Sequence, residues 1–163
     1  MRLPAALTRI LVPIDFSPSA RAALEYATFL AGKLDAELEV LHVWEPPGYL
    51  GPDTLALLPV GSGEPAWEQT RAEVQRELEQ QLARAVARPR AFSVRVEAGE
   101  PSDTILRLAR EGGVDLIVMG THGRTGLSRL LIGSVAEAVL RRSGCPVLTI
   151  RVPTRTSRDA VPL

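Results

Sequence analysis

Five short apolar runs alternate with helical segments along this chain, and that alternation restricts its fold more than any other feature. Residues 116–119, Leu-Ile-Val-Met, are apolar throughout, which is typical of a central strand covered on both faces. The five expected strands are residues 10–14, 38–43, 92–96, 116–119 and 147–152. Strands alternating with helices at this spacing predict an α/β domain with an open five-stranded parallel sheet and helices on both faces. Right-handed crossovers then favour the strand order 3-2-1-4-5.

The expected helices lie between these strands and carry boundary signals. Ser17-Pro18 predicts an N-cap followed by proline at the first helical position. Residues 64–88 predict a second, charged helix, and Gly112-Gly113 closes a third. Ser134 is expected to cap the fourth, which runs to Arg142.

These elements together predict a single domain over residues 1–152, followed by a flexible tail over residues 153–163. Residues 46–63 are rich in proline and glycine and show no sustained period, so we expect a long loop there. A long loop in a compact domain is more often a functional lid than filler.

The composition excludes several classes of function. The 19 basic residues balance 19 acidic ones, so no charge excess points to nucleic acid or to an anionic membrane surface. Lys33 is the only lysine, which rules out a phosphate-binding lysine elsewhere. Cys145 is the only cysteine, so neither an intramolecular disulfide nor a multi-cysteine metal site is possible. No run approaches the roughly 18 apolar residues of a membrane span and no secretory segment opens the chain, so we expect a soluble cytoplasmic protein.

The expected ligand site lies where the winding of the sheet reverses, beyond the carboxyl ends of the first and fourth strands. Asp15 follows the first of these strands and Gly120 follows the fourth. Two segments that are distant in the chain therefore converge on one predicted site.

The segment 120–134 carries features that favour a phosphate. Gly120 and Gly123 flank a turn directly after a buried strand, where glycine permits positive φ and close backbone approach. Gly133-Ser134 lies at a helix start, whose free N–H groups and dipole favour an anion, and Arg124 can add a planar bidentate donor set. The glycines could also serve only a tight connection, but the loop is long for that purpose. The segment matches neither the P-loop nor the dinucleotide-binding fingerprint, so the residues alone predict a nucleotide or phosphate site without naming the ligand.

Four stretches of sequence resemble one known family. They are Gly120-x-x-Gly123 followed after nine residues by Gly133-Ser134, the start Ile10-Leu-Val-Pro-Ile-Asp15-Phe-Ser, the strand end Leu41-His-Val43, and Gly144-Cys-Pro-Val-Leu148. In order and spacing the chain resembles the ATP-binding members of the universal stress protein family, from Ile10 to Val152. The resemblance implies a fold of the adenine nucleotide alpha hydrolase type and ATP bound with Mg²⁺ or Mn²⁺. It also implies homodimers joined through the edge strand Val147–Val152.

The same resemblance implies a set of site residues. By it, Asp15 would lie at the ribose and metal side of the nucleotide, Val43 would offer backbone groups to adenine, and Gly120 would pack near the ribose. The phosphates would be surrounded by Gly123, Arg124, Gly133, Ser134 and Val135. The expected nucleotide-binding set is completed by Pro13, Ile14, Met119 and His122.

Several of these residues keep a second interpretation. Asp15 is either a ligand-side carboxylate or a turn former that caps the following helix. His122 is either a general base or phosphate donor, or a loop histidine that faces solvent. His42 is expected to pack or to hydrogen-bond near the end of the sheet, and Cys145 to be structural.

Three functions follow from these alternatives. An ATP-binding regulatory homodimer in the stress response is expected first. A slow ATPase or phosphotransferase would need a base, for which His122 is the only nearby candidate, and at most weak hydrolysis is expected. The third alternative is an interaction module that binds no nucleotide.

Overall fold

The computed structural model describes residues 6–45, 91–121 and 132–152, together with the helical positions 72, 75, 76 and 80. The expected loop 46–63, most of the expected helix 64–88 and the expected tail 153–163 lie outside the described residues. The elements in chain order are β1 (Arg9–Pro13), α1 (Pro18–Leu34), β2 (Glu37–Trp44), β3 (Ala91–Ala98), α4 (Pro101–Glu111), β4 (Leu116–Gly120), α5 (Ser134–Arg142) and β5 (Val147–Ile150).

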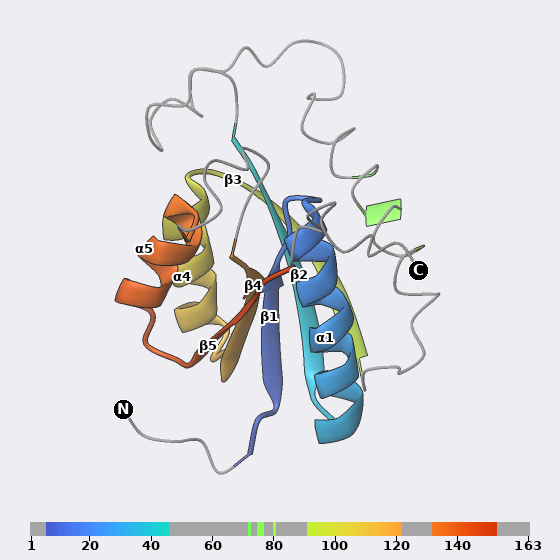
Figure 1. The fold of residues 1–163 in the computed structure, drawn as a ribbon. Helices are drawn as coiled ribbons and strands as arrows, with labels where there is room; N and C mark the ends of the chain where they lie inside the picture. The colour runs from blue at the N-terminus through green and yellow to red at the C-terminus, as the bar shows by residue number, and fades with distance from the viewer. Residues whose placement is uncertain are drawn as a thin grey trace, which may run out of the picture.

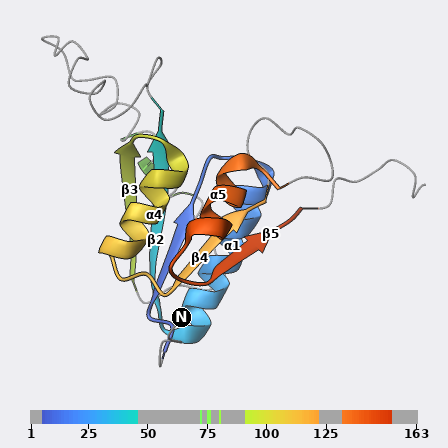
Figure 2. The same cartoon turned by 90° about the vertical axis from the view of Figure 1, so that its left-hand side faces the viewer.

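The strands form one parallel sheet in the order β3-β2-β1-β4-β5, which confirms the predicted fold class and strand order. Helix α1 covers one face of the sheet, and α4 and α5 lie together on the other (Figure 1). The perpendicular view shows α4 and α5 in front of the strands and α1 behind them (Figure 2). Among the residues that the structure describes, no helix combines the length and apolarity that a membrane span requires.

Each face of the sheet has its own apolar core because side chains alternate along a strand. In β1, Ile10 and Val12 pack toward α1, and Leu11 between them packs toward α4 and α5. In β4, Val118 belongs to the α1 side and Ile117 to the other. The central strands are thus buried on both faces, as their unbroken apolar sequences predict. Each such side chain contributes on the order of 1.5–3 kcal/mol by leaving water.

The two helices next to the winding reversal begin differently. At α1, Ser17 Oγ accepts a hydrogen bond from the N–H of Ala20 at 3.2 Å, and the predicted cap is confirmed. At α5 the predicted cap is wrong, because Gly133 occupies the N-cap position and Ser134 is the first helical residue. The Gly133 N–H donates to the carbonyl of Thr121 at 2.7 Å, which places the helix start directly beside the end of β4. Helix α5 therefore begins without a side-chain cap.

The edge strands also agree with the sequence, apart from their exact ends: β3 runs from Ala91 to Ala98 and not from 92 to 96. Strand β3 is an edge strand in which Ser93 and Arg95 are exposed and Val94 and Val96 are partly buried, as the alternating pattern predicts. Phe92, at the start of the strand, is 43% exposed and departs from that pattern. Strand β5 forms the opposite edge and ends at Ile150 rather than at Val152.

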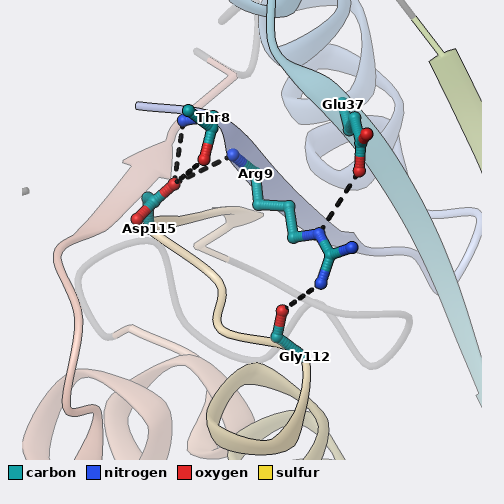
Figure 3. Close-up of polar contacts among 5 residues, drawn as sticks. All are labelled: Thr8, Arg9, Glu37, Gly112 and Asp115. Carbon is teal, nitrogen blue, oxygen red and sulfur yellow. Dashed lines mark hydrogen bonds and ion pairs between the residues drawn. The ribbon is translucent and has the colours of Figure 1, made fainter. Parts of the chain in front are cut away.

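A polar brace joins the amino ends of β1 and β4 (Figure 3). Asp115 Oδ2 accepts three hydrogen bonds, from Thr8 N–H and Thr8 Oγ1 at 2.8 Å each and from Arg9 N–H at 3.0 Å. The Arg9 guanidinium also donates to the carbonyl of Gly112 and pairs with Glu37 at 3.3 Å. Burial raises the pKa of Asp115, but these hydrogen bonds and the Arg9 charge outweigh it and hold that pKa below its ordinary value of 3.8.

This brace predicts an acid-sensitive part of the stability. Replacing Asp115 by Asn is expected to lower the free energy of unfolding at neutral pH by about 1–2 kcal/mol, discounted because the carboxylate is partly solvated. Because the folded-state pKa is depressed, the carboxylate stabilises the fold above its unfolded-state pKa, and this stabilisation is lost as pH falls through the folded-state value. Urea titrations at neutral and acidic pH should therefore show the variant and the wild type converging in acid. Glu25→Gln, at an exposed carboxylate on α1, is the control and should leave the difference near zero at both pH values.

Candidate functional site

A cavity of about 500 Å³ opens at the carboxyl end of the sheet, where the winding reverses between β1 and β4. Its walls come from the ends of β1, β2 and β4 and from the first turns of α1, α4 and α5. Its volume lies within the range typical of small-molecule sites, roughly 300–1,000 Å³. The cavity therefore stands where parallel sheets of this order bind their ligands.

Residues from distant parts of the chain meet around this cavity. Of the predicted set, the described residues that line it are Pro13, Ile14, Asp15, Val43, Met119, Gly120, Gly133, Ser134 and Val135. The remaining predicted residues, His122, Gly123 and Arg124, lie outside the described residues.

Asp15 forms the turn that connects β1 to α1. Its Oδ1 accepts a hydrogen bond from the N–H of Ser17 at 3.0 Å, and the residue between them, Phe16, has a left-handed φ of 64°. The structure therefore confirms that Asp15 forms the turn, whereas the N-cap of α1 is Ser17 and not Asp15. The residue also lines the cavity, so the same turn brings a carboxylate to its wall.

Gly120 stands at a close contact between β4 and α1. A Cβ atom at this position would lie 2.7 Å from Ser19 Oγ and 2.8 Å from the backbone nitrogen of Ala20. Real Cβ atoms do not approach backbone so closely, and the absence of a side chain lets the first turn of α1 rest on the end of β4. Gly120, the last residue of β4, thus has a packing role in addition to its place in the cavity wall.

Backbone dipoles and acidic side chains define the electrostatics of the cavity. The charged side chains among its described lining residues are Asp15 and Glu45, both acidic. The positive end of the α5 dipole lies at Gly133 and Ser134, where first-turn N–H groups lack intrahelical acceptors. An anionic group is therefore favoured at the α5 side, and a neutral or cationic group at the Glu45 side.

Some lining residues were not predicted from the sequence. Pro101 and Ile105 of α4 belong to the wall, as do Trp44 and Glu45 beyond Val43. The place of α4 in the wall could have been predicted from the topology. A helix that follows a parallel strand begins at the carboxyl edge of the sheet, so its first turn lies there.

His42 takes the structural role that the sequence suggested. Its Nδ1 lies 2.8 Å from the carbonyl oxygen of Ile14, and its ring centroid lies 5.2 Å from that of Phe16. The prediction that His42 packs and hydrogen-bonds near the end of the sheet is confirmed.

Residues 6–151 match the model of the universal stress protein family. The chain belongs to this family. Universal stress protein MJ0531 of Methanocaldococcus jannaschii is 32% identical over 90% of this chain and 84% of its own length. Among solved structures, the universal stress protein UspA from Lactobacillus plantarum is similar with a TM-score of 0.74 and 28% identity, covering 91% of this chain and all of that one. A universal stress protein in complex with cAMP is similar with a TM-score of 0.66 and 25% identity, covering 91% of this chain and 100% of its own.

Proposed function

We propose that this universal stress protein binds an adenine nucleotide, ATP with Mg²⁺ or Mn²⁺, in the cavity at the carboxyl end of the sheet. The observation that carries the proposal is the cavity itself, which gathers the ends of β1, β2 and β4 and the uncapped start of α5. The related protein in complex with cAMP supports an adenine nucleotide as the class of ligand.

The proposed orientation follows from the charges of the wall. The phosphates lie at Gly133, Ser134 and Val135, where the helix dipole favours an anion. The base lies toward Val43, whose backbone supplies hydrogen bonds. His122, Gly123 and Arg124 are proposed to complete the phosphate side.

The chemistry of the donor set decides how a metal would be held. Among the described residues, no group of three histidine, cysteine or carboxylate side chains could hold a metal ion by itself. Asp15 would thus be one ligand among nucleotide phosphates and waters, which is the usual arrangement for Mg²⁺. The metal would neutralise phosphate charge beside Asp15.

Titration calorimetry with purified protein tests this function. We expect saturable binding of one ATP per chain in the presence of Mg²⁺, together with nucleotide released on heating the protein as isolated. The absence of binding at millimolar ATP would refute the proposal and leave the interaction module as the alternative.

The proposed biological unit is a homodimer in the cytoplasm that signals nucleotide occupancy. Strand β5 pairs with β4 on one side and is an edge of the sheet on the other, which makes it the proposed contact. Sedimentation velocity should give twice the 17.6 kDa chain mass, and a monomer at high concentration would contradict the dimer.

A further inference from the structure

The carbonyl group of Ile14 has an unexpected hydrogen-bond partner. Ile14 follows β1, and its N–H donates to the carbonyl of Leu41 at 2.8 Å, which continues the parallel β1–β2 pairing. In a parallel ladder the next hydrogen bond would run from Val43 N–H to the carbonyl of Ile14. The structure instead places His42 Nδ1 at 2.8 Å from that oxygen.

Because His42 and not Val43 bonds to the Ile14 carbonyl, the backbone of Val43 lies outside the β1–β2 ladder. Alternate residues of a strand direct their N–H and C=O groups to opposite neighbours. The Leu41 carbonyl bonds to the β1 side and the Trp44 carbonyl accepts from Gly99 at the end of β3, so Val43 directs its groups to the β1 side. No described backbone group there hydrogen-bonds to Val43 N–H, and Val43 lines the cavity.

The bond to Ile14 and one further contact hold the imidazole in place. A carbonyl oxygen only accepts, so His42 must carry a proton on Nδ1 to bond to Ile14. The ring also packs against Phe16, whose left-handed φ of 64° is costly for a residue with a Cβ atom. His42 thus fixes the residues on both sides of Asp15, the carboxylate-bearing residue of the turn.

We propose that His42 is a positioning residue of the ligand site. Its imidazole donates a hydrogen bond to the Ile14 carbonyl. The Val43 N–H therefore remains available to donate to an acceptor atom of the ligand, such as a purine ring nitrogen. The role in ligand binding rests on the proposed function. The hydrogen bond from His42, in place of Val43, to the Ile14 carbonyl is a property of the protein alone.

Two substitutions separate the donor from the ring. His42→Phe keeps an aromatic ring against Phe16 but has no donor, and His42→Asn keeps an N–H donor near the position of Nδ1 but has no ring. In the Phe variant we expect the Ile14 carbonyl to recruit Val43 N–H and the dissociation constant for ATP to rise about tenfold, as one lost hydrogen bond predicts. In the Asn variant we expect the dissociation constant to stay within about threefold of the wild type. Equal losses in both variants would overturn the proposal.

Measurements without ligand test directly whether His42 or Val43 donates to the Ile14 carbonyl. In the wild type, long-range ¹H–¹⁵N correlation spectra should show neutral His42 protonated on Nδ1, with the signals assigned by the Asn variant. The Val43 amide should exchange with solvent faster than the Leu41 amide and become protected in the Phe variant. A neutral ring protonated on Nε2, or a Val43 amide as protected as that of Leu41 in the wild type, would refute the proposal.

The tautomer is measured on the wild-type chain, so this test remains valid even if the Phe variant fails to fold. A wild type that binds no ATP would refute the proposed function, and the tautomer and exchange data would still decide the role of His42 in the sheet.

Discussion

A Gly133→Val variant is expected to lose about a hundredfold or more in ATP affinity while it keeps its fold. Gly133 is the N-cap of α5 and lines the cavity, so an isopropyl group there would occupy the space that the phosphates need. Its φ of −60° and ψ of 150° are open to any residue, and valine adopts them without backbone strain. We therefore expect the melting temperature to fall by only a few degrees, as a change of about 1 kcal/mol at a helix cap predicts.

Calorimetry and thermal unfolding on the same samples check this result. Gly144→Val is the matched control, because a Cβ atom at Gly144 meets nothing within 4 Å and the residue is not part of the cavity wall. The control should bind ATP like the wild type. Unchanged ATP affinity in Gly133→Val would show that the phosphates do not lie at the start of α5.

Gly120→Ala is expected to reduce both stability and binding. The added Cβ would lie 2.7–2.8 Å from atoms of Ser19 and Ala20, and two of these three are backbone atoms that cannot rotate away. The first turn of α1 must then move off the end of β4, at a cost of about 1–3 kcal/mol in the free energy of unfolding. Because Ser17 and Ala20 also line the cavity, this movement should weaken ATP binding as well.

Urea unfolding and calorimetry measure the two effects, with Gly144→Ala as the control for the loss of a glycine. The control should change the free energy of unfolding by less than about 0.5 kcal/mol. A Gly120→Ala variant as stable as its control would mean that α1 does not rest tightly on β4. The two glycines thus predict different patterns: binding alone is lost at Gly133, and binding falls together with stability at Gly120.

Most of the fold could be predicted because its determinants are local. The unbroken apolar run 116–119 indicated a buried central strand, and the alternation around Phe92 indicated an exposed edge. Both features result from the period of the side chains along a strand, which is visible in the sequence. Strand order then followed from the handedness of the crossovers.

Features that depend on long-range contacts were not predicted. The brace joins Asp115 to Thr8 across 107 positions of the chain, and no pattern in either segment announces it. The N-cap of α5 is Gly133 rather than Ser134 because a hydrogen bond from Gly133 to Thr121 fixes where the helix begins, whereas the cap preference of serine is a weaker local signal.

The location of the candidate site could be predicted from the sequence, but the roles of its residues could be predicted only in part. Topology placed Asp15 and Gly120 at one edge, and both line the cavity. The packing role of Gly120 could not be seen in advance, because it depends on how closely α1 approaches the sheet. Likewise, a hydrogen bond near the sheet end was expected for His42, but its partner, the Ile14 carbonyl, depends on where β1 leaves the ladder.

The bond between Thr121 and Gly133 also bears on how this protein can diversify. It joins the two ends of the segment 122–132 at 2.7 Å, so the chain leaves the site and returns to it at one fixed point. Doubling the length of a segment with fixed ends costs only about 0.6 kcal/mol of closure entropy. A change in the number of residues between Thr121 and Gly133 is therefore expected to cost little stability, so the length of this segment can vary while the fold is kept.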